Sequence, residues 1–118
     1  MTQIKDILNL SPEDAHRMQQ EGQAVIIDVR EPSEFAVERI PGALNLPLST
    51  FDPTSLLAVV DPQRVVFQCG SGVRSMKAVM ACRLSGLAAD QHLAGGIGAW
   101  KAAGLPTIRI DPATGRPV

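Results

Sequence analysis

The sequence of 118 residues is poor in aromatic side chains, with no tyrosine, one tryptophan and three phenylalanines. A folded core must therefore be mainly aliphatic. Cysteine is also scarce: Cys69 and Cys82 form no CxxC pair and exclude a disulfide framework, so both are expected to be free thiols. The two cysteines and two histidines show no metal-ligand spacing, and we expect neither a metal nor another cofactor.

The sequence has no excess of charge of either sign and no apolar run long enough to span a bilayer. The formal net charge of -1 gives no overall attraction to nucleic acid or to an anionic membrane, and we expect neither as a partner. Residues 1–6 are polar and lack the apolar run of a secretory signal. A cytoplasmic location is the resulting expectation.

What the chain does have is the composition of a globular protein, with 45% hydrophobic and 19% charged residues. Its length suits one domain and leaves no room for two. We therefore expect a single domain over residues 1–118. Residues 107–118 form a tail that either frays or packs as an extended strap.

Strand-like and helix-like segments alternate along the chain. Short runs rich in β-branched residues at 24–29 and 64–68 predict strands buried on both faces, as in parallel sheets. Alternation of strands with helices indicates an α/β fold with a mainly parallel sheet. Two briefer strands are expected at 44–46 and 90–94. Helical segments are expected from the Ser11 cap to Gly22, and at 32–38, 55–59, 74–85 and 99–103.

Cys69 stands directly after the second buried strand and shortly before a predicted helix. In open parallel sheets, ligands bind beyond the carboxyl ends of the strands. Gly70 and Gly72 let backbone amides turn inward to form an anion-binding nest, and the helix that follows adds its own amides. Such a nest favours the thiolate, which is the reactive form of cysteine. The predicted site is Cys69 with Gly70, Ser71, Gly72, Val73, Arg74 and Ser75.

A persulfide on Cys69 suits this nest because it is anionic and its outer sulfur needs several donors at once. Arg74 supplies a cation for anionic oxygens, and Ser75 either offers its hydroxyl to the sulfur or caps the helix. No histidine is needed as a base, and neither His16 nor His92 neighbours Cys69 in the sequence. The alternative is that Cys69 is only a small buried hydrophobic residue.

Three segments of the sequence resemble the rhodanese-like family. Residues 65–75 resemble its active-site segment, with the pattern Cys-x-x-Gly-x-Arg-Ser intact. Residues 27–35 and 40–47 resemble its upstream signature, and residues 92–106 resemble its C-terminal signature. The resemblance covers nearly the whole chain in the right order, which makes it far more specific than the loop alone.

The resemblance implies a five-stranded, mostly parallel sheet with helices on both faces. It also implies transfer of sulfane sulfur from thiosulfate or a similar small anionic donor to cyanide or a thiol, through a persulfide on Cys69. The amides of residues 70–74 would form the cradle, with Arg74 as the anion clamp. Asp28 and Arg30 either support the site or form a buried ion pair. The alternative function is a sulfur-carrier or adaptor module that docks to a protein acceptor.

Two features bear on specificity within this resemblance. The family commonly has Gly-His before Ile-Pro-Gly-Ala, whereas this chain has Glu38 and Arg39. Arg39 would then be a second cation at the mouth of the site, or the two residues form a solvated surface pair. Four residues separate Cys69 from Arg74, one fewer than in the related phosphatases and arsenate reductases, and the tighter loop favours sulfur over a tetrahedral phosphate.

Two apolar patterns mark the helix after the loop. The position of Cys82 predicts a core residue rather than a second reactive thiol. A further apolar stripe packs beneath a neighbouring helix or forms a partner surface. Its members are Met76, Met80, Leu84 and Leu87.

Overall fold

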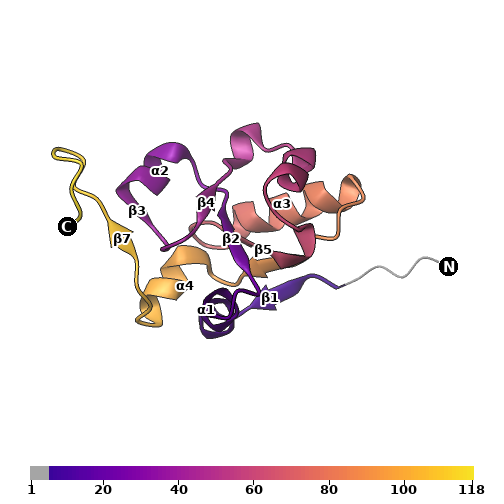
Figure 1. Ribbon diagram of the computed structural model, residues 1–118, viewed down its shortest axis with the longest axis horizontal. Coiled ribbons are helices and arrows are strands. Elements are labelled where there is room, and N and C mark those ends of the chain that lie inside the picture. Colours follow the sequence, from indigo (N-terminus) through magenta and orange to yellow (C-terminus); the bar gives the residue numbers. More distant parts are fainter. Residues whose placement is uncertain (1–5) are drawn as a thin grey trace.

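The computed structural model describes residues 6–118, so the polar segment 1–5 lies outside the described residues. Five parallel strands form one sheet in the order β1-β6-β5-β2-β4 (Figure 1). The predicted α/β fold with a five-stranded parallel sheet is confirmed. The strands are β1 (Leu8–Leu10), β2 (Val25–Asp28), β4 (Leu44–Asn45), β5 (Val65–Gln68) and β6 (Gln91–Leu93).

The two predicted buried strands lie side by side in the middle of the sheet. All four residues of β5 and the last three of β2 are buried. Asp28 pairs in register with Gln68, and Phe67 pairs with His92 of β6. Both strands therefore deliver their carboxyl ends to the same edge of the sheet, where Cys69 follows Gln68 directly.

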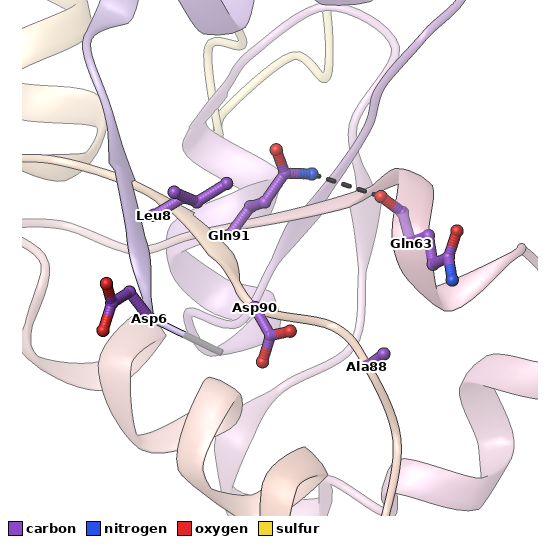
Figure 2. A pocket seen from close by; sticks show the side chains of 6 residues that line it. All are labelled: Asp6, Leu8, Gln63, Ala88, Asp90 and Gln91. Atoms are coloured by element: carbon purple, nitrogen blue, oxygen red, sulfur yellow. Dashed lines mark hydrogen bonds between the residues drawn. The ribbon is translucent and has the colours of Figure 1, made fainter. Parts of the chain in front are cut away.

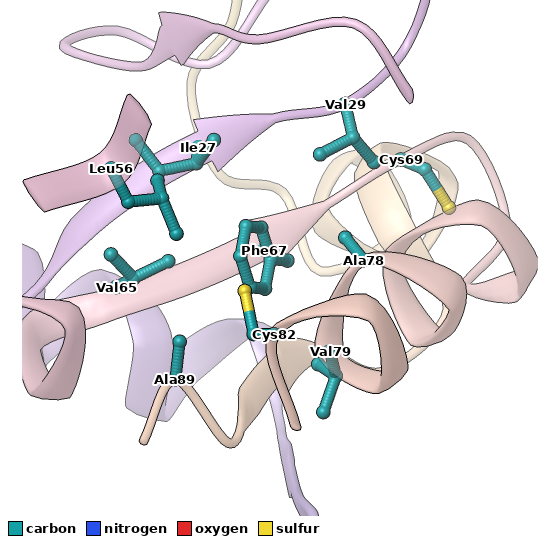
Figure 3. Close-up of a cluster of buried hydrophobic side chains, with 10 residues drawn as sticks. All are labelled: Ile27, Val29, Leu56, Val65, Phe67, Cys69, Ala78, Val79, Cys82 and Ala89. Atoms are coloured by element: carbon teal, nitrogen blue, oxygen red, sulfur yellow. The ribbon is translucent and has the colours of Figure 1, made fainter. Parts of the chain in front are cut away.

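Helices cover both faces of the sheet, and each face has its own apolar cluster. One face packs against α3 (Val73–Leu84) and the 3-10 helix η2 (Pro53–Ala58). The other packs against α1 (Pro12–Gln20) and α4 (Gly96–Ala102). The α3 cluster is drawn in Figure 3, with Phe67 at its centre.

Some helices begin or end at other residues than predicted, because local backbone pairing or turns decide where they start and stop. The helix expected at 32–38 is α2 (Pro32–Val37), because Glu38 pairs as a strand instead. The helix expected at 99–103 begins three residues earlier, since Gly95 and Gly96 turn the chain directly into it. Two further short 3-10 helices, η1 (Leu48–Thr50) and η3 (Pro62–Arg64), had no prediction.

The C-terminal tail packs as a strap rather than fraying. Strand β7 (Ile108–Arg109) pairs antiparallel with β3 (Glu38–Arg39), apart from the main sheet. Beyond it, Ile110 bridges to Pro117, and this segment lies at one end of the molecule (Figure 1). Within residues 6–118, no helix combines the length and apolar character needed to cross a membrane.

Candidate active site

Cys69 is placed by the end of β5 and the start of α3. Gly72 caps α3 with φ +108°, a left-handed conformation that favours glycine. Gly70 does not have a positive φ, so its predicted part in the turn does not rest on conformational freedom. Instead, a Cβ at position 70 would stand 3.3 Å from Arg74 Nη2, so glycine avoids a tight contact with the guanidinium.

The Cys69 sulfur receives hydrogen bonds from the backbone of the loop and of α3. The Gly72 amide donates to Sγ at 3.0 Å and the Ser75 amide at 3.3 Å. The Ser75 hydroxyl lies 3.6 Å from the same sulfur. Figure 3 shows this sulfur turned away from the apolar cluster toward the start of α3. The geometry is that of an anion cradle with the sulfur at its floor.

Opposing effects act on the ionisation of this sulfur. Burial raises the pKa of the Cys69 thiol, because the thiolate loses hydration. The amide and hydroxyl of Ser75 and the amides of Gly72 and Ser71 lower it, and they outweigh burial. The net pKa of Cys69 lies below its ordinary value, so the cradle favours the nucleophilic form.

The N-terminus of α4 holds the loop from behind. Ile97 donates its amide to the Cys69 carbonyl at 2.8 Å, and Gly98 donates to the Gly70 carbonyl at 3.2 Å. A Cβ at Gly96 would stand 2.2 Å from the Cys69 carbonyl oxygen, so only glycine permits this approach. Trp100 anchors α4, since its side chain is fully buried.

Arg74, the predicted anion clamp, already has an anionic partner. It donates to both oxygens of Glu34 of α2, at 2.7 and 3.1 Å. The hydrogen bonds from Arg74 lower the pKa of Glu34 despite partial burial, and Glu34 in turn raises the pKa of Arg74. Glu34 also accepts from the Glu31 amide at 2.9 Å, which fixes it at the start of α2. Sequence reasoning missed Glu34.

Asp28 and Arg30 form a buried ion pair at the end of β2. Arg30 Nη2 lies 2.8 Å from Asp28 Oδ2, and the Arg30 amide donates to Asp28 Oδ1 at 2.9 Å. Arg30 also donates to the Glu38 carbonyl, which ties β2 to β3. The pair therefore braces the edge of the sheet beside the loop. Arg30 also affects the site electrostatically, because its positive charge helps to lower the pKa of Glu34.

Glu38 and Arg39 do not form a solvated pair with each other. The Arg39 guanidinium lies over the Phe35 ring, 4.9 Å from its centroid. Glu38 faces the other way, accepting from Lys101 at 2.9 Å and from Thr107 at 2.7 Å. The structure thus gives Arg39 a cation–π contact on α2. A role for Arg39 at the mouth of the site stays a prediction.

His92 reaches the site although it is 23 residues from Cys69 in the sequence. Its Nδ1 lies 2.8 Å from the Ser75 hydroxyl, and its Nε2 lies 2.7 Å from Asn9 Oδ1 of β1. The sequence did predict a strand around His92. Had its place beside β5 been known, His92 could have been assigned to the site, because neighbouring parallel strands end at the same edge of a sheet.

The remaining side chains of α3 divide between core and surface. Cys82 is fully buried, as predicted, and Figure 3 shows its sulfur directed at the Phe67 ring. Burial raises the pKa of the Cys82 thiol to about 11. The apolar stripe does not pack beneath a helix along its whole length, because Met80 is 45% and Leu84 is 89% exposed.

A separate pocket lies at the opposite end of the sheet (Figure 2). It is formed where β1 and β6 begin and holds no cysteine. Gln91 donates to the Gln63 carbonyl across it at 3.2 Å. The pocket is lined by Asp6, Leu8, Gln63, Ala88, Asp90 and Gln91. Within residues 6–118, no group of three or more histidine, cysteine, aspartate or glutamate residues is arranged to hold a metal ion.

Comparisons with known proteins relate the chain to one family. The family model for the rhodanese-like domain matches residues 11–103. A sulfurtransferase of Allochromatium vinosum is 33% identical over 94 residues, which cover 80% of this chain and 87% of that protein. An uncharacterized protein of Synechocystis is 38% identical over 106 residues, covering 90% of this chain. This chain spans only 59% of the Synechocystis protein's length.

A solved structure gives the same fold. The rhodanese-like domain of an Anabaena protein superposes with a TM-score of 0.74 at 24% identity. The match covers 86% of this chain and 79% of that one.

Proposed function

This chain belongs to the rhodanese-like domain family, and we propose that it is a sulfurtransferase in which Cys69 carries sulfane sulfur as a persulfide. The observation that carries the proposal is the convergence of the Gly72 and Ser75 amides on Sγ. Such donors stabilise a thiolate and, equally, the anionic sulfur that replaces it. The name of the Allochromatium relative supports sulfur transfer as the general activity.

The reaction proceeds in two displacements on sulfur. The Cys69 thiolate attacks the sulfane sulfur of thiosulfate, a new S–S bond forms, and the donor S–S bond breaks to release sulfite with the electron pair. Cyanide or a thiolate then attacks the outer sulfur, and the Cys69 thiolate leaves. The products are thiocyanate or a persulfide of the acceptor, and the enzyme returns to its starting state.

The loop residues have distinct parts in this scheme. Residues 70–75 surround the anionic donor: the backbone holds the sulfur, and Arg74, shared with Glu34, faces the sulfonate oxygens. Val73 is 63% exposed, so a donor that approaches the loop from solvent would contact it. Asp28 and Arg30 support the edge of the sheet from which the loop springs.

Intact-mass measurement tests the first displacement. Incubation with thiosulfate is expected to add one sulfur atom to the wild-type protein and none to Cys69→Ser. Cys82→Ala is the matched control, because it removes the other thiol and should load normally. If the wild-type protein takes up sulfur from no donor tried, including thiosulfate and a small persulfide, the proposed function is wrong.

A sulfur-carrier module that docks to a protein acceptor is the second candidate. The exposed Met80 and Leu84 on the outer face of α3 favour it, since apolar side chains on one helix face suit a protein partner. Slow turnover with cyanide and small thiols, combined with rapid transfer from loaded Cys69 to a protein acceptor, would identify this mode. Fast turnover with small acceptors would assign the enzyme mode instead.

A further inference from the structure

A continuous chain of hydrogen bonds leads from the Cys69 sulfur to the edge of the sheet. Sγ lies 3.6 Å from the Ser75 hydroxyl, and that hydroxyl lies 2.8 Å from His92 Nδ1. On the far side of the ring, Nε2 lies 2.7 Å from Asn9 Oδ1. Cys69 and Ser75 are fully buried and His92 is 4% exposed, whereas Asn9 is exposed on strand β1.

The fold fixes the order of this chain of contacts. Asn9 and His92 are register partners on parallel strands, so their side chains stand on the same face of the sheet. That face is the one covered by α3, whose buried Ser75 meets the ring from above. The Asn9 oxygen facing Nε2 places the ring proton there, which leaves Nδ1 as an acceptor. Nδ1 lies 2.8 Å from the Ser75 hydroxyl oxygen, closer than the Gly72 carbonyl at 3.1 Å, to which this hydroxyl can also donate.

We propose that Ser75, which contacts the Cys69 sulfur, and His92, a positioning residue that acts through Ser75, take up the proton of Cys69 and so convert the buried thiol into the reactive thiolate. The significance of this relay for turnover rests on the proposed function, whereas the proton transfer itself does not. Neither side chain needs to touch the sulfur donor, because His92 acts only through Ser75.

The proton transfer balances without an outside reagent. The S–H bond of Cys69 breaks and its proton passes to Ser75 Oγ, while the hydroxyl proton of Ser75 passes to His92 Nδ1. The result is a thiolate and an imidazolium, in which Nε2–H still donates to Asn9. The reversed chain then runs from Nδ1–H to Oγ and from Oγ–H to the sulfur anion, so each hydrogen bond also stabilises the new charges.

The surroundings of His92 suit a proton acceptor. Asn9 faces the ring from β1, Ser75 faces it from α3, and a Cβ at Gly72 of the loop would stand 4.0 Å from its Cε1. Its register partner on β5 is the apolar Phe67. Burial lowers the pKa of His92 because it disfavours the imidazolium, so the ring would hold the extra proton only while the thiolate formed with it balances the charge. Arg74, the charged residue of α3 nearest in sequence to Ser75, is held by Glu34.

Thiolate absorbance near 240 nm measures the ionisation of Cys69 directly, without donor or turnover. The chain suits this titration because it has no tyrosine, and Cys69→Ser supplies the blank. We expect His92→Gln to reduce the thiolate fraction at about pH 7 roughly tenfold, a rise of about one unit in the titration midpoint. His16→Gln, the same change on α1, is the matched control and should leave the midpoint in place.

A second pair of variants separates a relay from a structural role. Ser75→Ala should raise the midpoint, and adding His92→Gln to it should produce no further shift, because the effect of His92 passes through Ser75. A merely structural His92 would lower the melting temperature and leave the midpoint unchanged. Superimposable titrations of the wild type and His92→Gln overturn the proposal, as does a full additional shift in the double variant.

Asn9→Asp keeps the proposal testable if changes at the buried His92 prevent folding. Position 9 is exposed, and a carboxylate there would stabilise the imidazolium and so favour the thiolate. The midpoint of Cys69 should fall, with roughly tenfold more thiolate at an acidic pH. An unchanged midpoint overturns the relay. Failure of the wild type to take up sulfur overturns the proposed function alone, because this titration requires no sulfur donor.

Discussion

Arg74 and Glu34 form a two-bond ion pair, with nitrogen–oxygen distances of 2.7 and 3.1 Å, across the gap between α3 and α2. The cation beside the Cys69 loop is therefore already neutralised in the resting protein. An anionic donor of the proposed kind would have to share this guanidinium with Glu34 rather than meet a free charge. The side chains remain 35% and 39% exposed, so water and salt screen the pair.

Glu34→Gln is expected to improve binding of anionic donors. Without the carboxylate, the full charge of Arg74 faces the donor, and the KM for thiosulfate should fall by about threefold at low salt. Stability should decrease by about 0.5–1 kcal/mol, because Glu34 also anchors the first turn of α2. Steady-state kinetics at two salt concentrations measure the effect. Glu13→Gln, an exposed change on α1, is the control, and an unchanged or higher KM would contradict the prediction.

Gly96→Ala should damage the site through packing. The added Cβ would collide with the Cys69 carbonyl at 2.2 Å, so the loop or α4 must move. Gly86→Ala is the matched control, since Gly86 also has a positive φ of 76° but meets nothing within 4 Å. The control should lose about 1 kcal/mol, the cost of the conformation alone, and Gly96→Ala should lose several times more. Urea unfolding measures the free energy of unfolding of both variants. Equal decreases would contradict the prediction, because the contact between position 96 and the Cys69 carbonyl would then cost nothing extra.

The two cysteines should differ sharply in reactivity. With a pKa of about 11, Cys82 is ionised in only about one molecule in a thousand at pH 8. Cys69 has a lowered pKa and should react first with a small alkylating agent. Peptide mass analysis after timed labelling distinguishes the two thiols. Cys82 should label only after denaturant is added, and comparable native rates would refute the assignment of Cys82 to the core.

Glu38 should make folding sensitive to acid. Burial raises the pKa of this carboxyl, but hydrogen bonds from Lys101 and Thr107 and the nearby charges bring it below its usual 4.5. The unfolded chain therefore takes up this proton at a higher pH than the folded protein. The stabilisation is complete above pH 4.5 and is lost as the pH falls through the folded pKa.

Glu38→Gln should accordingly flatten the loss of stability in acid. Urea midpoints measured at about pH 6 and pH 3.5 should differ less in this variant than in the wild type. Glu21→Gln, an exposed change at the end of α1, should retain the wild-type difference. Unaltered acid sensitivity in Glu38→Gln would mean that the contacts of Glu38 with α4 and the C-terminal strap contribute little.

Much of the architecture could be predicted because a local sequence pattern marks each of the central strands. Two short β-branched runs, one followed at once by Cys69 and a glycine-containing turn, sufficed to predict a parallel sheet with a loop at its carboxyl edge. The helix caps were equally local: the Ser11 hydroxyl accepts from the Asp14 amide at 3.1 Å, as its position before Pro12 predicted. The single-domain organisation and the binding role of residues 70–75 stay predictions.

The missed features depend on contacts between distant segments. Strand β1 is a three-residue edge strand, with Leu8 half exposed, and its sequence lacks the apolar run that marked β2 and β5. Strands β3 and β7 are two residues each and exist only as a pair. His92 enters the site through sheet order, which no local pattern encodes.

The complete burial of Cys69 has a consequence for which sulfur an incoming thiol can reach. The proposed persulfide would extend the side chain by one S–S bond, about 2 Å, so its outer sulfur would lie nearer the mouth of the cradle than the buried inner sulfur. A bulky nucleophile would therefore reach only the outer atom. Attack there releases the transferred sulfur, whereas attack on the inner atom would leave the protein trapped as a mixed disulfide. Under the proposed function, the depth of the cradle would thus set the regiochemistry of sulfur release and protect the protein from its own acceptors.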